Sequence, residues 1–279
     1  MGITISTLDY PNEIKDRLCK ALGYNYIIAE QEEQEYTLFT IDFDQSKKVI
    51  TLEYVAGILA DIVIEKLENK FINRTIKHKY QHFTIRERNK IQQLTIDHLN
   101  ETKKPGIPLG KIVRKEEIIA HILNYLKQNH DLNIEGFVRF RLKDYLDDLN
   151  LAVERAVDDY IIEKEYNEFI ELLKYFVDLQ EPRISSVHVL KQGDGSFQIL
   201  DRFENRISNE YLEGYLADMF EEEIEYEDLL VSALINVAPV RIVLHFEDKA
   251  AEKTVKKIFG SRVEICPGCK ICKNNWEIT

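Results

Sequence analysis

The sequence predicts an α+β fold, and three observations lead to this prediction. Strand-like alternation opens the chain, helical periodicity fills its middle, and a hairpin pattern followed by a strand–helix–strand pattern ends it. With 279 residues, of which 44% are apolar, the chain is long enough to bury a sizeable core. We expect a mixed α/β part over residues 1–70, a helical middle over 71–182 and a C-terminal α/β part with a cysteine-rich end over 183–279, which can pack as one unit.

The N-terminal part begins with a predicted strand over residues 3–8, where apolar and polar side chains alternate. A helix should follow, with Asp9 or Asn12 as its cap, because short polar side chains satisfy the free N–H groups of a first turn. Gly23 should end this helix, because glycine readily adopts the backbone conformations that follow a last turn.

Two β-rich runs come next, at residues 24–29 and 36–43. The polar run between them, residues 30–35, predicts an exposed hairpin loop. From Thr51, apolar residues recur at helical spacing and predict a helix that reaches at least Leu67.

The middle of the chain is predicted to be helical. Helices at residues 86–100 and 114–129 flank a proline- and glycine-rich breaker. The strongest periodic segment follows, with apolar residues three and four positions apart: Leu142, Leu146, Leu149, Val153, Ala156 and Tyr160. After a polar break near residues 163–165, a similar seam continues through Phe169, Leu173 and Phe176. This pattern predicts one long helix, or two consecutive helices, with a buried apolar stripe.

The C-terminal part opens with a hairpin signal, because the β-rich runs 187–190 and 197–200 flank the turn-forming residues 192–196. Helices are predicted at about residues 208–221 and 226–236. A strand, a helix and a second strand are then predicted at residues 240–246, 250–259 and 262–265. Such a β-α-β unit should be parallel and right-handed.

The charge balance disfavours broad binding to nucleic acids or anionic membranes, since 37 basic and 49 acidic residues leave a net charge of −12. No apolar run reaches the roughly 18 residues of a membrane span, so we expect no membrane insertion. The first residues lack the basic start of a secretory signal. We therefore expect a cytoplasmic protein whose cysteines stay reduced.

Three of the four cysteines lie within seven residues, at Cys266, Cys269 and Cys272. Two overlapping C-x-x-C spacings can turn three thiolates toward one centre. The trio directly follows the last predicted strand, and His245 lies near the carboxyl end of the neighbouring strand. Because ligands gather at that edge of parallel sheets, we predict a Cys₃His zinc site with His245 as the fourth ligand and Cys19 as the reserve.

Other interpretations of the trio stay open. An iron–sulfur cluster also accepts closely spaced cysteines. A reduced tail without any ligand, or a catalytic dithiol in a redox-active protein, are the remaining alternatives. The few residues after Cys272 disfavour a thioredoxin-like motif, which opens a full helix. The sequence also lacks the phosphate-binding, dinucleotide-binding and nucleophile-elbow motifs, so an enzyme is the less favoured interpretation.

A local basic stretch at residues 70–90 contains seven basic residues and one acidic residue, interleaved with aromatic side chains. This composition is typical of some nucleic-acid-binding surfaces. Residues 131–181 carry 14 acidic and six basic residues, so the stretch could instead pair with the protein's own helices. We favour pairing within the chain or exposure to solvent, and nucleic acid is not the expected partner.

Several segments, taken as a set, resemble the sporulation protein YtxC family. The similarity covers roughly residues 135–272 and is carried by residues 137–145, 156–160, 165–170, 173–182, 187–190 and 226–234. The resemblance implies a cytoplasmic protein of endospore-forming bacteria, and it supplies no catalytic residues. We therefore expect a protein associated with endospore formation that acts through contacts with an unknown protein partner. A metal-binding or redox-active protein, and a nucleic-acid-binding protein, are the alternatives.

Overall fold

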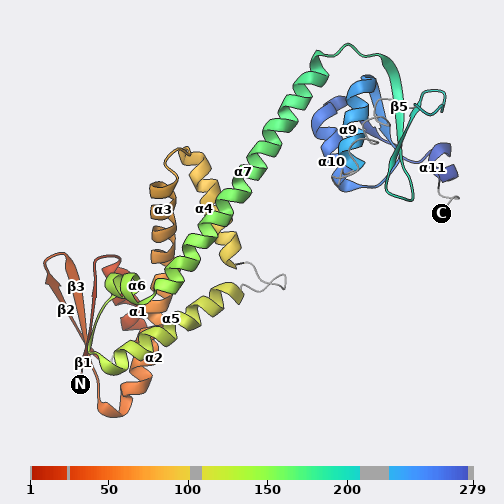
Figure 1. The fold of residues 1–279 in the computed structure, drawn as a ribbon. Helices are drawn as coiled ribbons and strands as arrows, with labels where there is room; N and C mark the ends of the chain where they lie inside the picture. The colour runs from red at the N-terminus through yellow and green to blue at the C-terminus, as the bar shows by residue number, and fades with distance from the viewer. Residues whose placement is uncertain (1, 24–25, 101–108, 208–225, 276–279) are drawn as a thin grey trace. The chain divides into compact units, whose positions relative to one another are not determined.

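The computed structural model describes residues 2–23, 26–100, 109–207 and 226–275. Its helices and two small sheets confirm the predicted α+β class (Figure 1). The chain divides into two compact units, Met1–Ile162 and Glu163–Thr279. Their border lies inside one long helix, α7 (Lys143–Leu179). The two units are defined by contacts between residues. The three parts expected from the sequence were defined by composition and periodicity, so their borders differ.

The N-terminal unit contains a four-stranded sheet in the order β2-β3-β1-β4. Its strands are β1 (Gly2–Thr7), β2 (Ile27–Glu33), β3 (Tyr36–Asp42) and β4 (Asp131–Asn133). The strand β3 pairs antiparallel with both β1 and β2, and β4 pairs parallel with β1. Alternate residues of β1, among them Ile3 and Ile5, are buried, as the alternation in the sequence predicts.

The predicted hairpin loop over residues 30–35 is wrong for most of its length. The strand β2 continues to Glu33, and the turn is confined to Gln34 and Glu35. Because β2 is the edge strand of its sheet and most of its residues are exposed, polar side chains are compatible with a strand here.

The first helix, α1 (Pro11–Leu22), ends at Gly23 as predicted, but neither Asp9 nor Asn12 is its cap. Tyr10 occupies the N-cap position in a left-handed conformation, without a side-chain hydrogen bond to the helix. The proline at the first helical position has no N–H group that would need a partner, so this helix start does not depend on a polar cap.

The remaining helices of this unit are α2 (Lys48–Ile62), α3 (Glu68–Lys79), α4 (Ile85–Asn100), α5 (Leu109–Gln128), α6 (Ile134–Arg141) and the first part of α7. A π-helical turn, Val63–Leu67, joins α2 to α3. The helix α7 has no break at residues 163–165, so it contains both predicted seams except for Leu142, which is the C-cap of α6. The seam residues Leu142, Leu149 and Val153 are all buried.

Beyond residue 162 the predicted seam is wrong in its positions. Phe169 and Phe176 are 56% and 52% exposed, whereas Ile170 and Val177 are buried in the core of the C-terminal unit. The apolar residues of this part of α7 surround the helix, so spacing alone could not select the buried side. Leu173 lies between the two sets and is partly buried.

The C-terminal unit contains a second four-stranded sheet, in the order β6-β5-β7-β8. Its strands are β5 (Ile184–Lys191), β6 (Phe197–Asp201), β7 (Pro239–Leu244) and β8 (Val263–Ile265). The predicted hairpin is confirmed, because β5 pairs antiparallel with β6. The strand β7 pairs parallel with β8 and also with β5.

Helices α9 (Tyr226–Val237) and α10 (Lys249–Phe259) complete this unit together with the short α11 (Lys270–Asn275). The helix α10 connects β7 to β8, so the element order and the parallel pairing of the predicted β-α-β unit are confirmed. The helix predicted at about residues 208–221 lies outside the described residues. None of the helices in the described segments combines the length and apolar character needed to cross a membrane.

Candidate metal centre

Two parallel strands position the first residues of the centre. His245 directly follows β7 and Cys266 directly follows β8, so both lie at the carboxyl edge of the sheet. Backbone bonds hold both positions: His245 N donates to Val189 O at 2.8 Å, and Cys266 N donates to Leu244 O at 2.9 Å. The backbone on both sides of the site is therefore fixed by the sheet.

A tight loop and a helical turn bring the other two sulfur atoms back to this edge. Gly268 has a φ of 112°, a conformation that suits glycine, and its N–H donates to the Sγ of Cys266 at 3.4 Å. Cys269 ends the loop, and Cys272 lies three residues later in α11. Two residues at this spacing in a loop and first helical turn can present their sulfur atoms to a common point.

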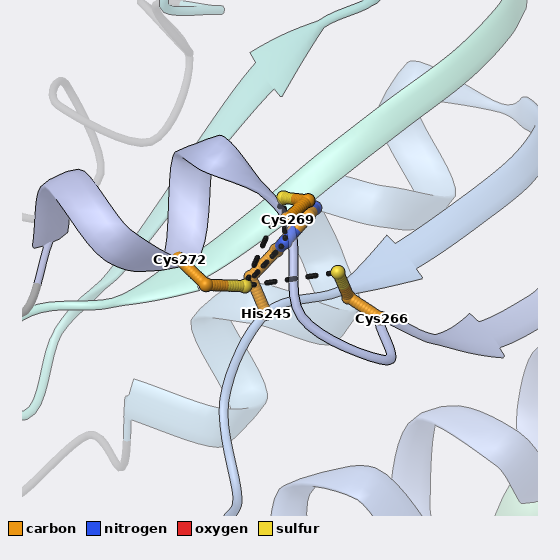
Figure 2. Close-up of side chains that lie close together, drawn as sticks. All are labelled: His245, Cys266, Cys269 and Cys272. Atoms are coloured by element: carbon orange, nitrogen blue, oxygen red, sulfur yellow. Dashed lines mark hydrogen bonds between the residues drawn. The ribbon is translucent and has the colours of Figure 1, made fainter.

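The four side chains form one cluster, shown in Figure 2, with the three cysteines gathered around His245. Their ligand atoms all lie within 4.8 Å of one another. The Sγ atoms of Cys269 and Cys272 are 3.8 Å apart, and those of Cys272 and Cys266 are 3.7 Å apart. The His245 Nδ1 is 3.2 Å from the Sγ of Cys272 and 3.5 Å from that of Cys269.

These separations fit the edges of a single tetrahedron. With zinc–sulfur bonds of about 2.3 Å, tetrahedral geometry places the ligand sulfur atoms about 3.8 Å apart. Zinc–nitrogen bonds of about 2.0 Å give slightly shorter nitrogen–sulfur edges. The donor set of three thiolates and one imidazole is also a common one for structural zinc. The residues present therefore fit a single zinc ion.

The electrostatics of the cluster differ from residue to residue. The backbone N–H of Cys272 holds the pKa of the Cys269 thiol below its usual value. Burial raises the pKa of the Cys266 thiol, in spite of the N–H bond from Gly268. Burial and the neighbouring His188 lower the pKa of His245, which favours the neutral imidazole that can donate a lone pair to a metal.

His188 is a residue of this site that the sequence did not reveal. Its Nδ1 lies 2.8 Å from the Nε2 of His245, on the side of the ring away from the sulfur atoms. In the parallel β5–β7 pair, His188 is the partner of Val243. His245 follows Val243 by two residues, and residues two apart along a strand point to the same face, so His188 and His245 share one face of the sheet. Only the knowledge that β5 pairs with β7 would have pointed to it.

The structure brings together four of the five predicted site residues. Cys266, Cys269, Cys272 and His245 form the cluster, whereas the reserve ligand Cys19 is an exposed residue of α1 in the N-terminal unit. Among the described residues, the group of neighbouring metal-ligand side chains contains His245 and does not contain Cys19.

The basic stretch at residues 70–90 makes several bonds within the N-terminal unit. Lys79 pairs with Glu154 of the acidic segment at 3.1 Å, and Lys70 pairs with Asp9. The guanidinium of Arg88 donates to a backbone carbonyl at 2.6 Å. These bonds support the interpretation that part of the stretch serves the protein's own fold.

The C-terminal unit also has an apolar groove of about 700 Å³ between α9, α10 and the end part of α7. Its apolar lining includes Phe169, Leu173, Val231, Ile235 and Ile258. Glu227 and Asp228 lie on the α9 wall, and Lys253 and Lys257 lie on the α10 wall. The groove therefore combines an apolar lining with acidic residues from α9 and basic residues from α10.

Comparison with known proteins places the chain in a family. The model of the YtxC-like family matches residues 53–264. The "Uncharacterized protein YtxC" of Bacillus subtilis (strain 168) is 27% identical over 218 residues, which cover 77% of this chain and 76% of that protein. No solved structure matches significantly. The match contains His188 and His245 and ends before Cys266, and over this length it shows that the chain belongs to the YtxC-like family.

Proposed function

We propose that the C-terminal unit holds one structural zinc ion, bound by Cys266, Cys269, Cys272 and His245. The observation that carries this proposal is the convergence of four ligand atoms within 4.8 Å. Two of the residues follow neighbouring parallel strands, and a loop and a helical turn supply the other two. The three thiols are half-buried, and the four separations of 3.2–3.8 Å match the edges of a tetrahedron around one ion.

A single metal ion fits these distances better than an iron–sulfur cluster. In a four-iron cluster each thiolate binds a different iron, so the ligand sulfur atoms lie around the outside of a body several atoms wide. The sulfur–sulfur distances of 3.7 and 3.8 Å correspond to ligands that share one ion. Thiolate and imidazole ligands in a tetrahedron favour zinc among the metal ions that cells supply.

The ligand set favours a structural role over a catalytic one. Structural zinc sites use four protein ligands, whereas catalytic sites keep one position open for water or substrate. Here four side chains account for all positions of a tetrahedron. The ion would attach the loop and α11 to the sheet edge, and it would keep the three thiols from redox exchange. We therefore propose a non-enzymatic protein.

Metal binding can be tested by removing the ligands. The triple variant Cys266→Ser, Cys269→Ser and Cys272→Ser should purify without zinc and unfold at a lower temperature, because metal binding to the folded state stabilises it. Cys19→Ser is the matched control and should keep both the metal and the stability. Equal metal content in the triple variant and the unaltered protein would contradict the proposal.

The cellular part of the proposal is that this protein works in the cytoplasm during endospore formation, through contact with another protein. The support is the resemblance to the sporulation YtxC family together with the groove of the C-terminal unit. Its oppositely charged walls suit an amphipathic helix of a partner. Such a helix would place apolar side chains against the apolar lining, basic residues beside Asp228 and acidic residues beside Lys253.

This contact can be tested in the organism that makes the protein. A photoreactive amino acid at Ser232 in the groove should crosslink to one partner in sporulating cells. Charge reversal by Lys253→Glu should abolish that crosslink, whereas reversal of the exposed Lys20 in the other unit should leave it unchanged. A crosslink that is absent, or that survives Lys253→Glu, would contradict the proposed contact.

The association with endospore formation has its own test. Deletion of the gene should reduce the yield of heat-resistant spores without slowing vegetative growth. A deletion strain with normal spore yield would contradict this part of the proposal and leave the metal centre unaffected.

A further inference from the structure

We propose that His188 is a positioning residue for the metal centre: it holds the His245 ring so that Nδ1, and not Nε2, faces the three sulfur atoms. This inference rests on the proposed zinc site and adds to it a residue outside the four ligands. The observation that carries it is the 2.8 Å contact between His188 Nδ1 and His245 Nε2.

The two nitrogen atoms of His245 face different neighbours. Its Nδ1 lies 3.2 and 3.5 Å from the sulfur atoms of Cys272 and Cys269, and its Nε2 lies beside His188. An imidazole that binds a metal through Nδ1 carries its proton on Nε2. With a metal on Nδ1, the His245 Nε2–H would therefore donate to the His188 Nδ1, which requires the His188 tautomer with its proton on Nε2.

The sheet fixes the backbone positions from which the His188 and His245 rings project. His188 lies within β5 opposite Val243, and His245 follows two residues after Val243 on the same face. The His245 N–H also donates to Val189 O, the residue next to His188. Because β5 holds both the backbone and the ring of His245, the imidazole is oriented before any metal arrives.

Loss of the acceptor would free the ring to rotate. A half-turn about the Cβ–Cγ bond exchanges Nδ1 with a carbon atom and removes the fourth ligand from the centre. Partners that orient metal-bound histidines in this way are worth on the order of 10–100-fold in metal affinity. We expect an effect of this size when the His188 acceptor is removed.

The test compares two variants of the full chain. His188→Phe keeps a ring of similar size without an acceptor, and His188→Asn keeps an oxygen near the place of Nδ1. Zinc affinity is measured by competition with a chelator. The state of the His245 nitrogens is followed in long-range ¹H–¹⁵N spectra of histidine-labelled protein. Thermal unfolding of the metal-free proteins checks that both variants fold.

The expected result is a loss of about 10–100-fold in zinc affinity for His188→Phe, with altered His245 nitrogen signals, and substantial recovery in His188→Asn. Unchanged affinity and signals in His188→Phe would overturn the inference while leaving the zinc site intact. Equal weakening by both variants would overturn it too, because the hydrogen bond would then not be the cause. If the unaltered protein binds no metal, the proposed function itself fails.

Discussion

The three thiols of the centre are close neighbours with different chemistry. The backbone N–H of Cys272 lowers the pKa of Cys269, whereas burial raises the pKa of Cys266. At neutral pH, Cys269 therefore contributes more thiolate to the metal-free protein. Metal ions that reach the site should meet this thiolate first, since the thiolate is the ligand form.

Iodoacetamide should accordingly modify Cys269 faster than Cys266 in reduced, metal-free protein at pH 7, because only the thiolate reacts. Zinc should protect both residues and leave Cys19 reactive. Mass spectrometry of peptides after timed exposure measures the three rates. Faster modification of Cys266 would show that the pKa order is reversed.

Another residue-scale feature is a buried ionic group in the N-terminal unit. The Glu68 carboxylate accepts from Arg114 Nε at 3.2 Å and from the Tyr145 hydroxyl at 2.8 Å. The Glu68 and Arg114 side chains are only 9% and 11% exposed. Burial beside Glu68 raises the pKa of Tyr145, so its hydroxyl stays a donor. The three residues connect α3, α5 and α7.

Glu68→Ala should destabilise the N-terminal unit by about 3–5 kcal/mol, because it leaves a buried guanidinium without its carboxylate. Glu53→Ala, at an exposed position of α2, is the control and should change stability by less than about 0.5 kcal/mol. Urea unfolding of both variants measures the difference. Similar midpoints would mean that water replaces the carboxylate readily.

At the scale of elements, the seam of α7 carries much of the packing of the N-terminal unit. Leu149→Ala should lower the free energy of unfolding by about 2–5 kcal/mol, because Leu149 is buried in the core with only 3% of its surface exposed. Leu151→Ala in the same helix is the matched control, since Leu151 is 52% exposed. Denaturant unfolding of both variants is the measurement, and a near-zero loss for Leu149→Ala would place the seam outside the core.

The basic stretch is the second element with a testable role. Reversal of Lys77, Lys79 and Arg86 to Glu should leave nucleic-acid affinity negligible, as it should be in the unaltered protein. The ion pair of Lys79 with Glu154 and the net charge of −12 both lead to this expectation. Binding is measured by fluorescence anisotropy at several salt concentrations. Tight, salt-sensitive binding that the reversal abolishes would establish a nucleic-acid surface instead.

For the whole molecule, the sequence predicted most elements from local periodicity. It also predicted the cysteine trio from its spacing, and His245 from the expected parallel pairing of two consecutive strands. Helical and strand periodicity located α7 and the β-α-β unit, and the predicted strand ends located His245 and the start of the cysteine trio. The sequence did not predict which strands pair when they lie far apart in the chain. The three-residue β4 and the parallel β5–β7 pair have no local signal, and His188 depends on the latter. The border between the units coincides with the polar break in the seam near residues 163–165, although α7 continues through it as one helix.

The most direct test of the proposed zinc centre is X-ray absorption at the zinc edge of the purified protein. The account predicts one zinc per chain, with three sulfur ligands at about 2.3 Å and one nitrogen ligand at about 2.0 Å, the latter with the outer-shell pattern of an imidazole. Protein without near-stoichiometric zinc, or zinc surrounded mainly by oxygen, would contradict the account, and so would iron with a short iron–iron distance.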